Sequence, residues 1–451
     1  MDALEPLLPI ARAIRARGGR AVVVGGFPRD TLLGRASKDL DVEVFGLGAD
    51  VLREALSGFG EVLTFGRAFE VMRVRGVDVD FTLPRLPAGA PGDFAAAARG
   101  RDLTINAIGF DPLSGEWLDP LGGRRDLEAR VLRAADPTRF AEDPLRGLRV
   151  MQLAARFDLT PDAELLALCA GLDLSELPGE RVRVEIDKLL LEAPRPSVGL
   201  ALLRETGMLR FFPELAALVG VPQDPAWHPE GDVWTHTLLC LDVAAEMRRG
   251  DADDAAFVYG VLCHDFGKPE ATRAAGGRIR ALDHARAGVE KTRSFLERLR
   301  APHVRGRRVE ALVAHHLAPA QLPEQGATPR AYRRLARTLA ASDVTPRLLE
   351  RVARADHWGR TTPDARARRF PAGDAFLAAV ADLALADAGP RDAVQGRHLL
   401  ARGHEPGPEL GRVLSRCREI QDETGWTDAD AILDRALGER RNPLSRPDPA
   451  R

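Results

Sequence analysis

A glycine pair followed by an alternating acidic strand constrains this chain more than any other feature. Gly25 and Gly26 directly follow an apolar run at residues 21–24, which is typical of a buried strand. Acidic and apolar residues then alternate strictly over residues 39–44, so Asp39 and Asp41 share one face of a second strand. The sequence therefore predicts a tight backbone turn beside a pair of carboxylates.

This pairing of a turn with carboxylates points to a particular chemistry. Residues i and i+2 of a strand lie roughly 7 Å apart, and two carboxylates at that separation repel each other unless a hard cation lies between them. Glycines let backbone N–H groups approach a phosphate closely. We therefore expect a site for Mg²⁺ and a nucleoside triphosphate. The competing interpretation is a solvated edge strand after a tight turn.

The bulk composition narrows the class of protein. A chain of 451 residues exceeds one ordinary core, so two to four domains are expected. The net charge of −2 carries no overall signature of nucleic-acid binding, although clustered arginines could bind phosphates locally. The four cysteines show no CxxC spacing, which argues against a zinc ribbon or a disulfide framework. With no signal peptide or membrane span visible, we expect a cytoplasmic protein without membrane contact.

Secondary-structure signals predict an α+β protein with a mixed-sheet head and an all-helical remainder. Alternating segments at residues 69–75 and 77–83 add strands to the first two, and residues 49–58 are expected to form a helix. From residue 141 onward, apolar residues recur at helical spacing and alternation almost disappears. We predict segments at 1–140, 141–222, 223–365 and 366–451, with a Pro-rich break near residue 222.

A third carboxylate is expected next to the first two. Asp80 lies in one of the alternating segments and could complete a trio with Asp39 and Asp41. Asp78 shares its strand face, so the sequence does not choose between them. Two-metal phosphoryl transfer uses such oxygen ligands to hold a triphosphate and an attacking hydroxyl. A solvated strand face is the alternative.

Two further stretches carry polar side chains suited to a nucleotide. Arg101, Asp102 and Asn106 could contact a triphosphate and a ribose, or Asp102 and Asn106 could simply be a helix cap and a buried amide. Glu142 and Asp143 begin a predicted helix, with proline in its first turn and Arg146 on the same face. A carboxylate beside a guanidinium offers fixed acceptors and donors that could pair with a nucleobase edge. An intrahelical ion pair is the simpler interpretation.

The order of these motifs resembles the bacterial-type (class II) tRNA nucleotidyltransferases, the CCA-adding enzymes of the polymerase-β-like nucleotidyltransferase superfamily. The resemblance covers most of the chain. The matching stretches are Gly25-Gly26-x-x-Arg29-Asp30, Asp39-x-Asp41, Arg101-Asp102-x-Thr-Ile-Asn106-Ala, Asp119-Pro-x-Gly-Gly, Glu142-Asp143-x-x-Arg146 and Glu180-Arg181-Val-Arg-Val-Glu185.

The resemblance implies a role for each matched residue. Asp39 and Asp41 would hold catalytic Mg²⁺ at the 3′ end of a tRNA. The triphosphate and ribose would be bound by Gly25, Gly26, Arg29, Asp30, Arg101, Asp102 and Asn106. The incoming CTP or ATP would be read by Asp143 and Arg146, with support from Glu142 and Arg149. The helical neck would thus replace a template strand.

One departure from the family pattern concerns substrate choice. The stretch between residues 85 and 101 is rich in Ala, Pro and Gly and looks about a dozen residues shorter than in CCA-adding relatives. Their longer loop is linked to the switch from CTP to ATP, and relatives without it resemble CC-adding enzymes. We therefore expect a CC-adding enzyme, with a separate A-adding enzyme acting after it. Full CCA addition is the alternative.

A second group of residues predicts a metal site in the helical part. His236, His264, Asp265 and Asp356 occur in the order typical of the HD phosphohydrolase superfamily, which they resemble. Imidazole and carboxylate ligands together suit a divalent transition metal such as Ni²⁺ or Mn²⁺. His264 and Asp265 are adjacent, so they reach one ion only at a helix end or with splayed side chains. A second metal or a phosphate could involve His284, His315 and His316, or these could be surface histidines.

Two other functions compete with tRNA extension. A poly(A) polymerase of the same superfamily would share the head motifs, but it typically carries a basic tail instead of an HD domain. An HD phosphohydrolase whose head only binds RNA is the other alternative, and the intact Asp39 and Asp41 argue against it. The resemblance thus assigns residues 1–140 to the nucleotidyltransferase head, 141–222 to the neck and body, 223–365 to the HD domain and 366–451 to a helical tail.

Overall fold

The computed structural model describes residues 4–36, 40–65, 70–84, 93–276 and 278–438. Asp39 and most of the short stretch after residue 84 therefore lie outside the described residues. The chain divides into two compact units, Met1–Phe211 and Phe212–Arg451, and each is described by itself. None of the helices in the described ranges is long and apolar enough to cross a bilayer.

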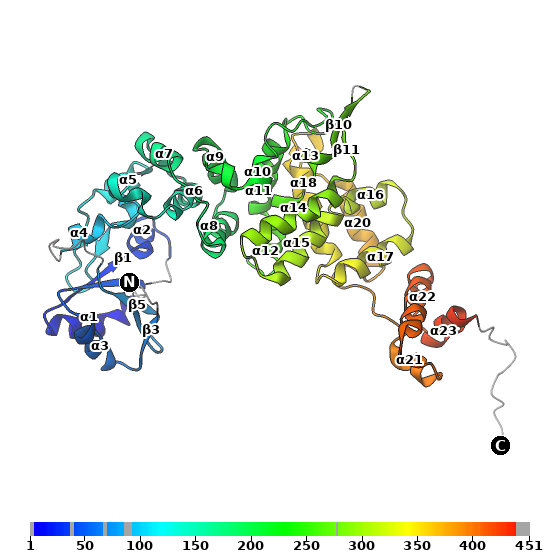
Figure 1. Cartoon of the computed structure of the whole chain (residues 1–451), viewed down its shortest axis with the longest axis horizontal. Coiled ribbons are helices and arrows are strands. Elements are labelled where there is room, and N and C mark those ends of the chain that lie inside the picture. Colours follow the sequence, from blue (N-terminus) through cyan, green and yellow to red (C-terminus); the bar gives the residue numbers. More distant parts are fainter. Residues whose placement is uncertain (1–3, 37–39, 66–69, 85–92, 277, 439–451) are drawn as a thin grey trace, which may run out of the picture. The chain divides into compact units, whose positions relative to one another are not determined.

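A mixed β-sheet organises the start of the first unit (Figure 1). Its strands are β1 (Arg20–Val24), β2 (Leu40–Phe45), β3 (Val62–Phe65), β4 (Val71–Val74), β5 (Val79–Thr82), β6 (Gly109–Phe110) and β7 (Trp117–Leu118). Their order is β3-β4-β5-β2-β1-β6-β7. Strand β2 runs antiparallel to β1 and parallel to β5, so both of its neighbours fix the position of its acidic face.

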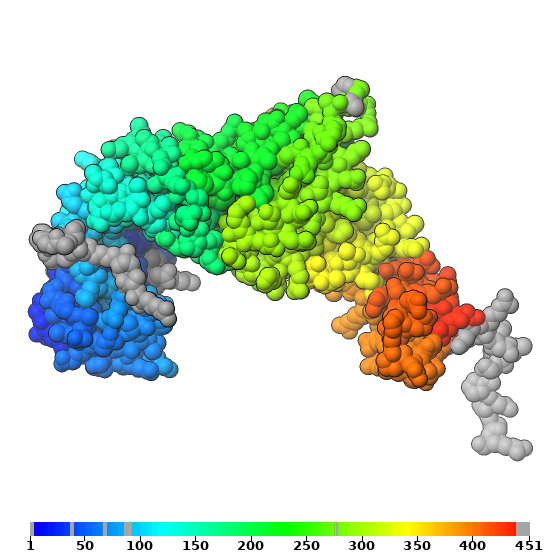
Figure 2. All heavy atoms as spheres, in the orientation of Figure 1, coloured from blue at the N-terminus to red at the C-terminus, as the bar shows by residue number. Residues whose placement is uncertain are grey.

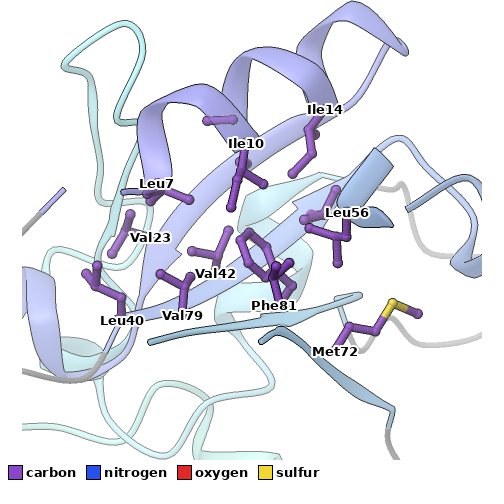
Figure 3. Packing of buried hydrophobic residues seen from close by; sticks show 14 of the residues in the cluster. Leu7, Ile10, Ile14, Val23, Leu40, Val42, Leu56, Met72, Val79 and Phe81 are labelled. Atoms are coloured by element: carbon purple, nitrogen blue, oxygen red, sulfur yellow. The ribbon is translucent and has the colours of Figure 1, made fainter. Parts of the chain in front are cut away.

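Helices α1 (Leu7–Ala16) and α3 (Ala49–Ser57) cover one face of this sheet. Figure 3 shows Ile10 and Ile14 of α1 pointing towards Val42 and Phe81 of the strands. Strand β2 alternates as predicted: Leu40, Val42 and Val44 are buried, whereas Asp41 is exposed. Burying a Val, Leu, Ile or Phe side chain stabilises a fold by roughly 1.5–3 kcal/mol. The apolar face of β2 therefore fixes which way its carboxylates point.

Short elements connect the sheet to the helical remainder of the unit. They are α2 (Gly26–Leu32), α4 (Phe94–Ala98), the 3-10 helix η2 (Thr104–Asn106), α5 (Gly123–Glu128), β8 (Val131–Leu132) and the 3-10 helix η3 (Pro137–Glu142). The helical remainder consists of α6 (Leu145–Phe157), α7 (Ala163–Ala170), α8 (Gly179–Glu192), α9 (Pro196–Glu205) and the 3-10 helix η4 (Met208–Phe211), with β9 (Thr160–Pro161) between α6 and α7. Helix α6 packs against α8 and α9.

The start of α6 corrects one prediction. We expected the helix to open at Glu142, but it begins at Leu145, with Pro144 as its N-cap. Asp143 is extended, with φ −133° and ψ 101°. The reason is steric, because a proline pushes the preceding residue out of the helical region. Glu142 and Asp143 therefore do not share a helical face with Arg146.

The second unit is built mainly from helices. Its centre consists of α11 (Val233–Glu246), α12 (Asp254–Cys263), α14 (His284–Arg298), α15 (His303–His315) and α18 (Pro346–Gly359). Around it lie α10 (Pro213–Ala216), α13 (Lys268–Ala271), α16 (Ala318–Glu324), α17 (Pro329–Ala340), α19 (Pro363–Arg366) and α20 (Pro371–Asp382). The last helices are α21 (Gly396–Ala401), α22 (Pro408–Thr424) and α23 (Ala429–Leu437), which form a small core of their own. In Figure 2 the atoms of the central helices, green to yellow, form a continuous surface.

The predicted fold class is confirmed, with one correction to the all-helical remainder. A hairpin of β10 (Thr272–Ala275) and β11 (Arg278–Ala281) interrupts the helices of the second unit. Its sequence signal was the Gly276-Gly277 pair between two short segments, which is typical of a hairpin turn. Helix α20 packs against α16 and α18, and so belongs with the central helices rather than with α21–α23.

Candidate active sites in the two units

The glycine turn and Asp41 meet in the first unit. Strand β1 ends at Val24, which lies opposite Asp41 in the antiparallel register. The chain then turns at Gly25, where φ is 73°, and α2 begins at Gly26. A Cβ atom on Gly25 would lie 3.1 Å from Oδ2 of Asp41. Both the positive φ and the close approach favour glycine here, and they place the carboxylate directly against the turn.

The strand register favours Asp80 over Asp78 as the companion of Asp41. In the parallel pairing of β2 with β5, Asp41 lies opposite Asp80, and adjacent strands are about 4.8 Å apart. The Asp78 side chain is 78% exposed and is not opposite Asp41. Asp80 accepts two hydrogen bonds from Arg73, at 2.7 and 2.9 Å. The register thus brings two carboxylates together, and Arg73 contacts one of them.

Arg101 supplies a cation beside the same turn. Its Nη2 atom lies 2.6 Å from Oε1 of Glu43, which follows Asp41 on the acidic face of β2. Its Nη1 atom would lie 3.7 Å from a Cβ atom on Gly25. The side chain is 21% exposed, so the guanidinium is held in place and remains accessible. A turn, a carboxylate and a guanidinium therefore converge at one edge of the sheet.

Four of the predicted nucleotide-binding residues instead form a chain of contacts, in which Arg29, Asp102 and Asn106 are buried and Arg149 is partly exposed. Arg29 donates to Asn106 (2.7 Å), Asn106 donates to Asp102 (3.0 Å), and Arg149 pairs with Asp102 (2.9 Å). Burial opposes ionisation of Asp102, but Arg149 and Asn106 outweigh it and hold the pKa of this carboxyl below its usual range. Arg29 also pairs with Asp30. The chain joins α2, η2 and α6, so these residues hold the turn against the neck.

The predicted base-reading residues do not pair with each other. Arg146 donates to the carbonyls of Arg139 and Gly100, each at 2.8 Å. Asp143 instead accepts a hydrogen bond from Arg181 of α8, at 2.8 Å, and both side chains are partly exposed. Glu142 pairs with Arg139. The partner Arg181 was missed as a site residue, although the stretch from Glu180 to Glu185 carried a signal.

The second unit brings all four predicted HD residues together. Nε2 of His236 lies 3.1 Å from Oδ1 of Asp356, and Nε2 of His264 lies 3.2 Å from Oδ2 of Asp265. Nε2 of His236 is also 4.0 Å from Asp265. Helix α12 ends at Cys263, so His264 and Asp265 lie at a helix end, which is one of the two arrangements that allow neighbours to face one centre.

The chemistry of this cluster fits a divalent cation. The four side chains are at most 10% exposed. Nε2 of His264 and both carboxylate oxygens of Asp265 are buried and make no regular hydrogen bond to a described residue, although Lys268 (2.7 Å) and His264 (3.2 Å) form ion pairs with Asp265. Leaving such groups unsatisfied is costly, and a buried charge without a well-made partner costs more. A metal bound by these atoms would supply the missing partner.

Asp265 also belongs to a second group of ligands with His284 and His316. Nε2 of His284 lies 3.4 Å from Oδ1 of Asp265 and 3.3 Å from Nε2 of His316. In His264, His284 and His316, Nδ1 contacts a backbone carbonyl, which leaves Nε2 for the centre. Burial lowers the pKa of His316 to about 3, so its imidazole is neutral. His315 is not part of this group.

Glu230 was missed by the sequence analysis. Its Oε1 atom accepts hydrogen bonds from His236 (2.8 Å) and His228 (2.9 Å), and its Oε2 atom accepts from the Thr361 backbone (3.0 Å). The side chain is 1% exposed. Burial opposes its ionisation, yet the two imidazoles outweigh it and hold the pKa of Glu230 well below its usual range. The carboxylate thereby directs Nε2 of His236 to the metal position.

Cys240 lies close to the cluster and forms a group of possible metal ligands with His236, His264 and Asp356. Its sulfur is 3.3 Å from Nε2 and 3.7 Å from Nδ1 of His236. Burial raises the pKa of this thiol well above its usual value.

A pocket of about 240 Å³ opens onto the HD cluster. Asp265, His284, His316 and Asp356 line it, together with the cations Lys268 and Arg360. Lys268 is held by Asp265 (2.7 Å) and Gln223 (2.6 Å). The pocket thus combines metal ligands with positive charge, as hydrolysis of a phosphate ester requires.

Comparison with known proteins identifies the class of each part. Residues 21–133 match the poly A polymerase head domain, and residues 163–218 match the probable RNA and SrmB-binding site of polymerase A. Residues 233–351 match the HD domain. The class is therefore a polymerase-type nucleotidyltransferase with an HD domain.

Relatives and solved structures define the family. The multifunctional CCA protein of Pasteurella multocida (strain Pm70) is 38% identical over 62% of this chain and 70% of its own length. That of Halorhodospira halophila (strain DSM 244 / SL1) is 40% identical over 62% and 69%. The Bacillus stearothermophilus CCA-adding enzyme in complex with CTP has the same fold, with a TM-score of 0.65, 20% identity and coverage of 97% and 98%. The chain belongs to the class II tRNA nucleotidyltransferases, the family of these CCA proteins, and is a nucleotidyltransferase of tRNA 3′ ends.

Proposed function

We propose that the first unit adds cytidines to the 3′ end of tRNA at the edge of the sheet where Gly25, Asp41 and Arg101 converge. The tRNA 3′ oxygen bonds to the α-phosphorus of CTP, the bond from that phosphorus to the bridging oxygen breaks, and pyrophosphate leaves. The hydroxyl proton passes to solvent. Magnesium held by Asp41, Asp80 and Asp39 would neutralise charge on the phosphates and the attacking oxygen. The approach of Asp41 to the Gly25 turn is the observation that carries this assignment.

The other head residues support this centre. Gly25 and Gly26 present backbone N–H groups to the triphosphate, and Arg101 neutralises part of its charge. The chain of contacts from Arg29 through Asn106 and Asp102 to Arg149 keeps the turn and α6 together, and Asp30 holds Arg29.

The neck residues select the nucleotide. Asp143 and Arg181 form a partly exposed pair of acceptor and donor, and Arg146 is the second residue of α6. Glu142 contacts Arg139 next to them. We propose that Asp143 and Arg146 exchange these contacts for the base edge of CTP. The carboxylate and guanidinium atoms that now contact protein partners are the same atoms that would form hydrogen bonds with the base.

The short connection before α4 supports addition of two cytidines only. Residues 83–92 are all that separate β5 from Asp93, the N-cap of α4. We propose that a separate enzyme adds the terminal adenosine. Incubation of a tRNA ending at the discriminator base with CTP and ATP tests this: denaturing gels should show two added nucleotides. A third nucleotide that depends on ATP would instead establish full CCA addition.

The HD cluster supports a second activity, hydrolysis of phosphate esters. The convergence of His236, His264, Asp265 and Asp356 in one buried cluster carries this proposal. Water adds to the phosphorus, one P–O ester bond breaks, and the proton of water passes to the leaving oxygen. Nickel or manganese held by His236, His264, Asp265 and Asp356 would activate that water. Lys268 and Arg360 of this chain hold the phosphate oxygens.

Metal replacement tests the hydrolase proposal. Treatment with a chelator should abolish hydrolysis of a nucleoside 2′,3′-cyclic phosphate, and Ni²⁺ or Mn²⁺ should restore it. Asp356→Asn should abolish hydrolysis without slowing nucleotide addition. Failure of every divalent metal to support hydrolysis would overturn the proposal.

A further inference from the structure

A second chamber adjoins the HD pocket. It has a volume of about 500 Å³. Trp227, His316, Leu317, Asp356 and Arg360 line both the chamber and the metal pocket. The two spaces are therefore two ends of one cleft. Asp265 and His284 line only the metal pocket, whereas Asp356 and His316 lie where the two spaces meet.

The walls of the second chamber are largely apolar and aromatic. Leu317, Pro323, Ala353 and Phe370 line it, and the ring of His357 stacks on Phe370 with centroids 4.5 Å apart and planes 18° apart. Nε2 of His357 is buried without a hydrogen-bond partner among the described residues. Apolar walls with one polar atom that lacks a hydrogen-bond partner are typical of a site for a flat heteroaromatic ligand.

Trp227 stands at the junction of the two spaces. Its side chain is 65% exposed although it lines both of them, so folding leaves a large aromatic face open to solvent. Stacking of a base on an aromatic side chain strengthens binding by about 5- to 150-fold. An exposed tryptophan at the mouth of a phosphate-binding pocket is therefore suited to a nucleobase.

Charge is divided between the two ends of the cleft. Lys268 and Asp224 line only the metal pocket, Arg360 lines both spaces, and Glu324 and Asp364 line only the second chamber. A phosphate is attracted to Lys268 and to a cation bound by the ligands of the metal pocket, and it is repelled by Glu324 and Asp364. A bound molecule with one anionic and one neutral aromatic end would consequently adopt a single orientation.

We propose that the second chamber is the base-binding subsite of the HD centre and holds the base of a nucleoside phosphate ester between Trp227 and the His357–Phe370 pair. This inference rests on the proposed hydrolase function. It assigns the base to residues outside the metal ligands. Sugar phosphates without a base would bind only through their phosphate.

The test compares two substrates with the same phosphate ring. One is a nucleoside 2′,3′-cyclic phosphate, and the other is methyl riboside 2,3-cyclic phosphate, which has no base. Ala372→Trp fills the second chamber from α20, and Ala375→Trp places the same bulk on the exposed face of that helix. We expect Ala372→Trp to raise KM for the nucleotide at least about tenfold and leave KM for the methyl riboside unchanged, since one lost stacking contact of ~1.4 kcal/mol is tenfold. Ala375→Trp should change neither.

A second variant guards against a folding defect. Trp227→Ala removes an exposed side chain, and it should reproduce the selective rise in KM. Equal effects of Ala372→Trp on both substrates, or an effect on neither, would overturn the subsite.

A binding measurement separates the subsite from the hydrolase proposal. If wild-type protein hydrolyses neither substrate with any metal, the hydrolase proposal fails. Calorimetric titration with a nucleoside 2′-monophosphate then decides: weaker binding to Ala372→Trp than to Ala375→Trp supports the subsite, and equal binding overturns it. The head is identical in both variants, so only the difference reports on the cleft.

Discussion

The candidate metal sites of the two units are built from different types of side chain. All ten histidines of the chain lie between His228 and His404, within the second unit, and the first unit has none. The head site is made of carboxylates and arginines on a sheet, whereas the HD site combines imidazoles with carboxylates between helices. Oxygen ligands alone suit Mg²⁺, and mixed nitrogen and oxygen ligands suit transition metals.

Exposure separates the two sites as clearly as composition does. Asp41 is exposed and the Asp80 side chain is 31% exposed, whereas His236 and His264 are at most 1% exposed. Exposed carboxylates are stable without a cation because water solvates them. Buried imidazoles and carboxylates lack this solvation and need another partner, such as a metal ion. We therefore expect the head to bind its metal together with the triphosphate and the HD cluster to hold a resident ion.

Removal of Asp41 should have the largest effect and should separate the two activities. Asp41→Ala takes away a metal ligand worth several kcal/mol of transition-state charge stabilisation, so addition to tRNA should fall by about 1,000-fold or more. Hydrolysis at the HD site should be unchanged. Single-turnover addition assays measure the loss. Asp78→Ala, at a neighbouring exposed carboxylate, is the matched control and should remain active.

Gly25→Ala should weaken addition by about 100-fold. The new Cβ atom must adopt a positive φ and approach Oδ2 of Asp41 to 3.1 Å, which displaces a metal ligand. Gly34→Ala has a similar φ of 68° but open space around it, and so measures backbone strain alone. Equal losses in both variants would show that strain, and not contact with Asp41, is responsible.

Glu230→Gln should weaken the resident metal by about 10- to 100-fold, because outer partners of metal-binding histidines contribute that much. Competition with a chromogenic chelator measures the affinity. Glu246→Gln is the control, because Glu246 is the exposed last residue of α11, the helix that carries His236. An unchanged affinity in Glu230→Gln would contradict the role of this carboxylate in orienting His236.

Acidification should have the smallest of these effects: it should lower the stability of the second unit more than that of the first. Burial lowers the pKa of His228 to about 4 and that of His316 to about 3. The unfolded chain binds protons below about pH 6.5 that these folded histidines do not, so the metal-free second unit should lose stability as pH falls from 6.5 towards 4. The histidine-free first unit should change little. Hydrogen exchange, corrected for intrinsic rates, at pH 7 and pH 5 checks this, and equal changes in both units would contradict it.

The sequence predicted what depends on local pattern. The alternation of β2 follows from one buried face, and it placed Asp41 correctly. The four HD residues were predicted from their order along the chain and its resemblance to the HD superfamily. The structure brings them together, and that they bind a metal stays a prediction. Both sites were therefore predictable from the spacing and order of aspartates and histidines along the chain.

The remaining features depend on tertiary contacts. The choice of Asp80 over Asp78 required the parallel register of β2 with β5. The late start of α6 follows from Pro144. The Arg146 side chain does not contact the Asp143 side chain, because it donates to backbone carbonyls instead. Glu230 lies in a Pro-rich segment without a motif, and only packing against His236 reveals it.

Metal content is the most direct test of the contrast between the two units. Purified wild-type protein, Asp41→Ala and Asp356→Asn are passed through gel filtration without added metal and analysed for bound elements. We predict about one or two transition-metal ions in wild type and in Asp41→Ala, and a marked loss in Asp356→Asn. Loss of the ion in Asp41→Ala, or its full retention in Asp356→Asn, would contradict the account.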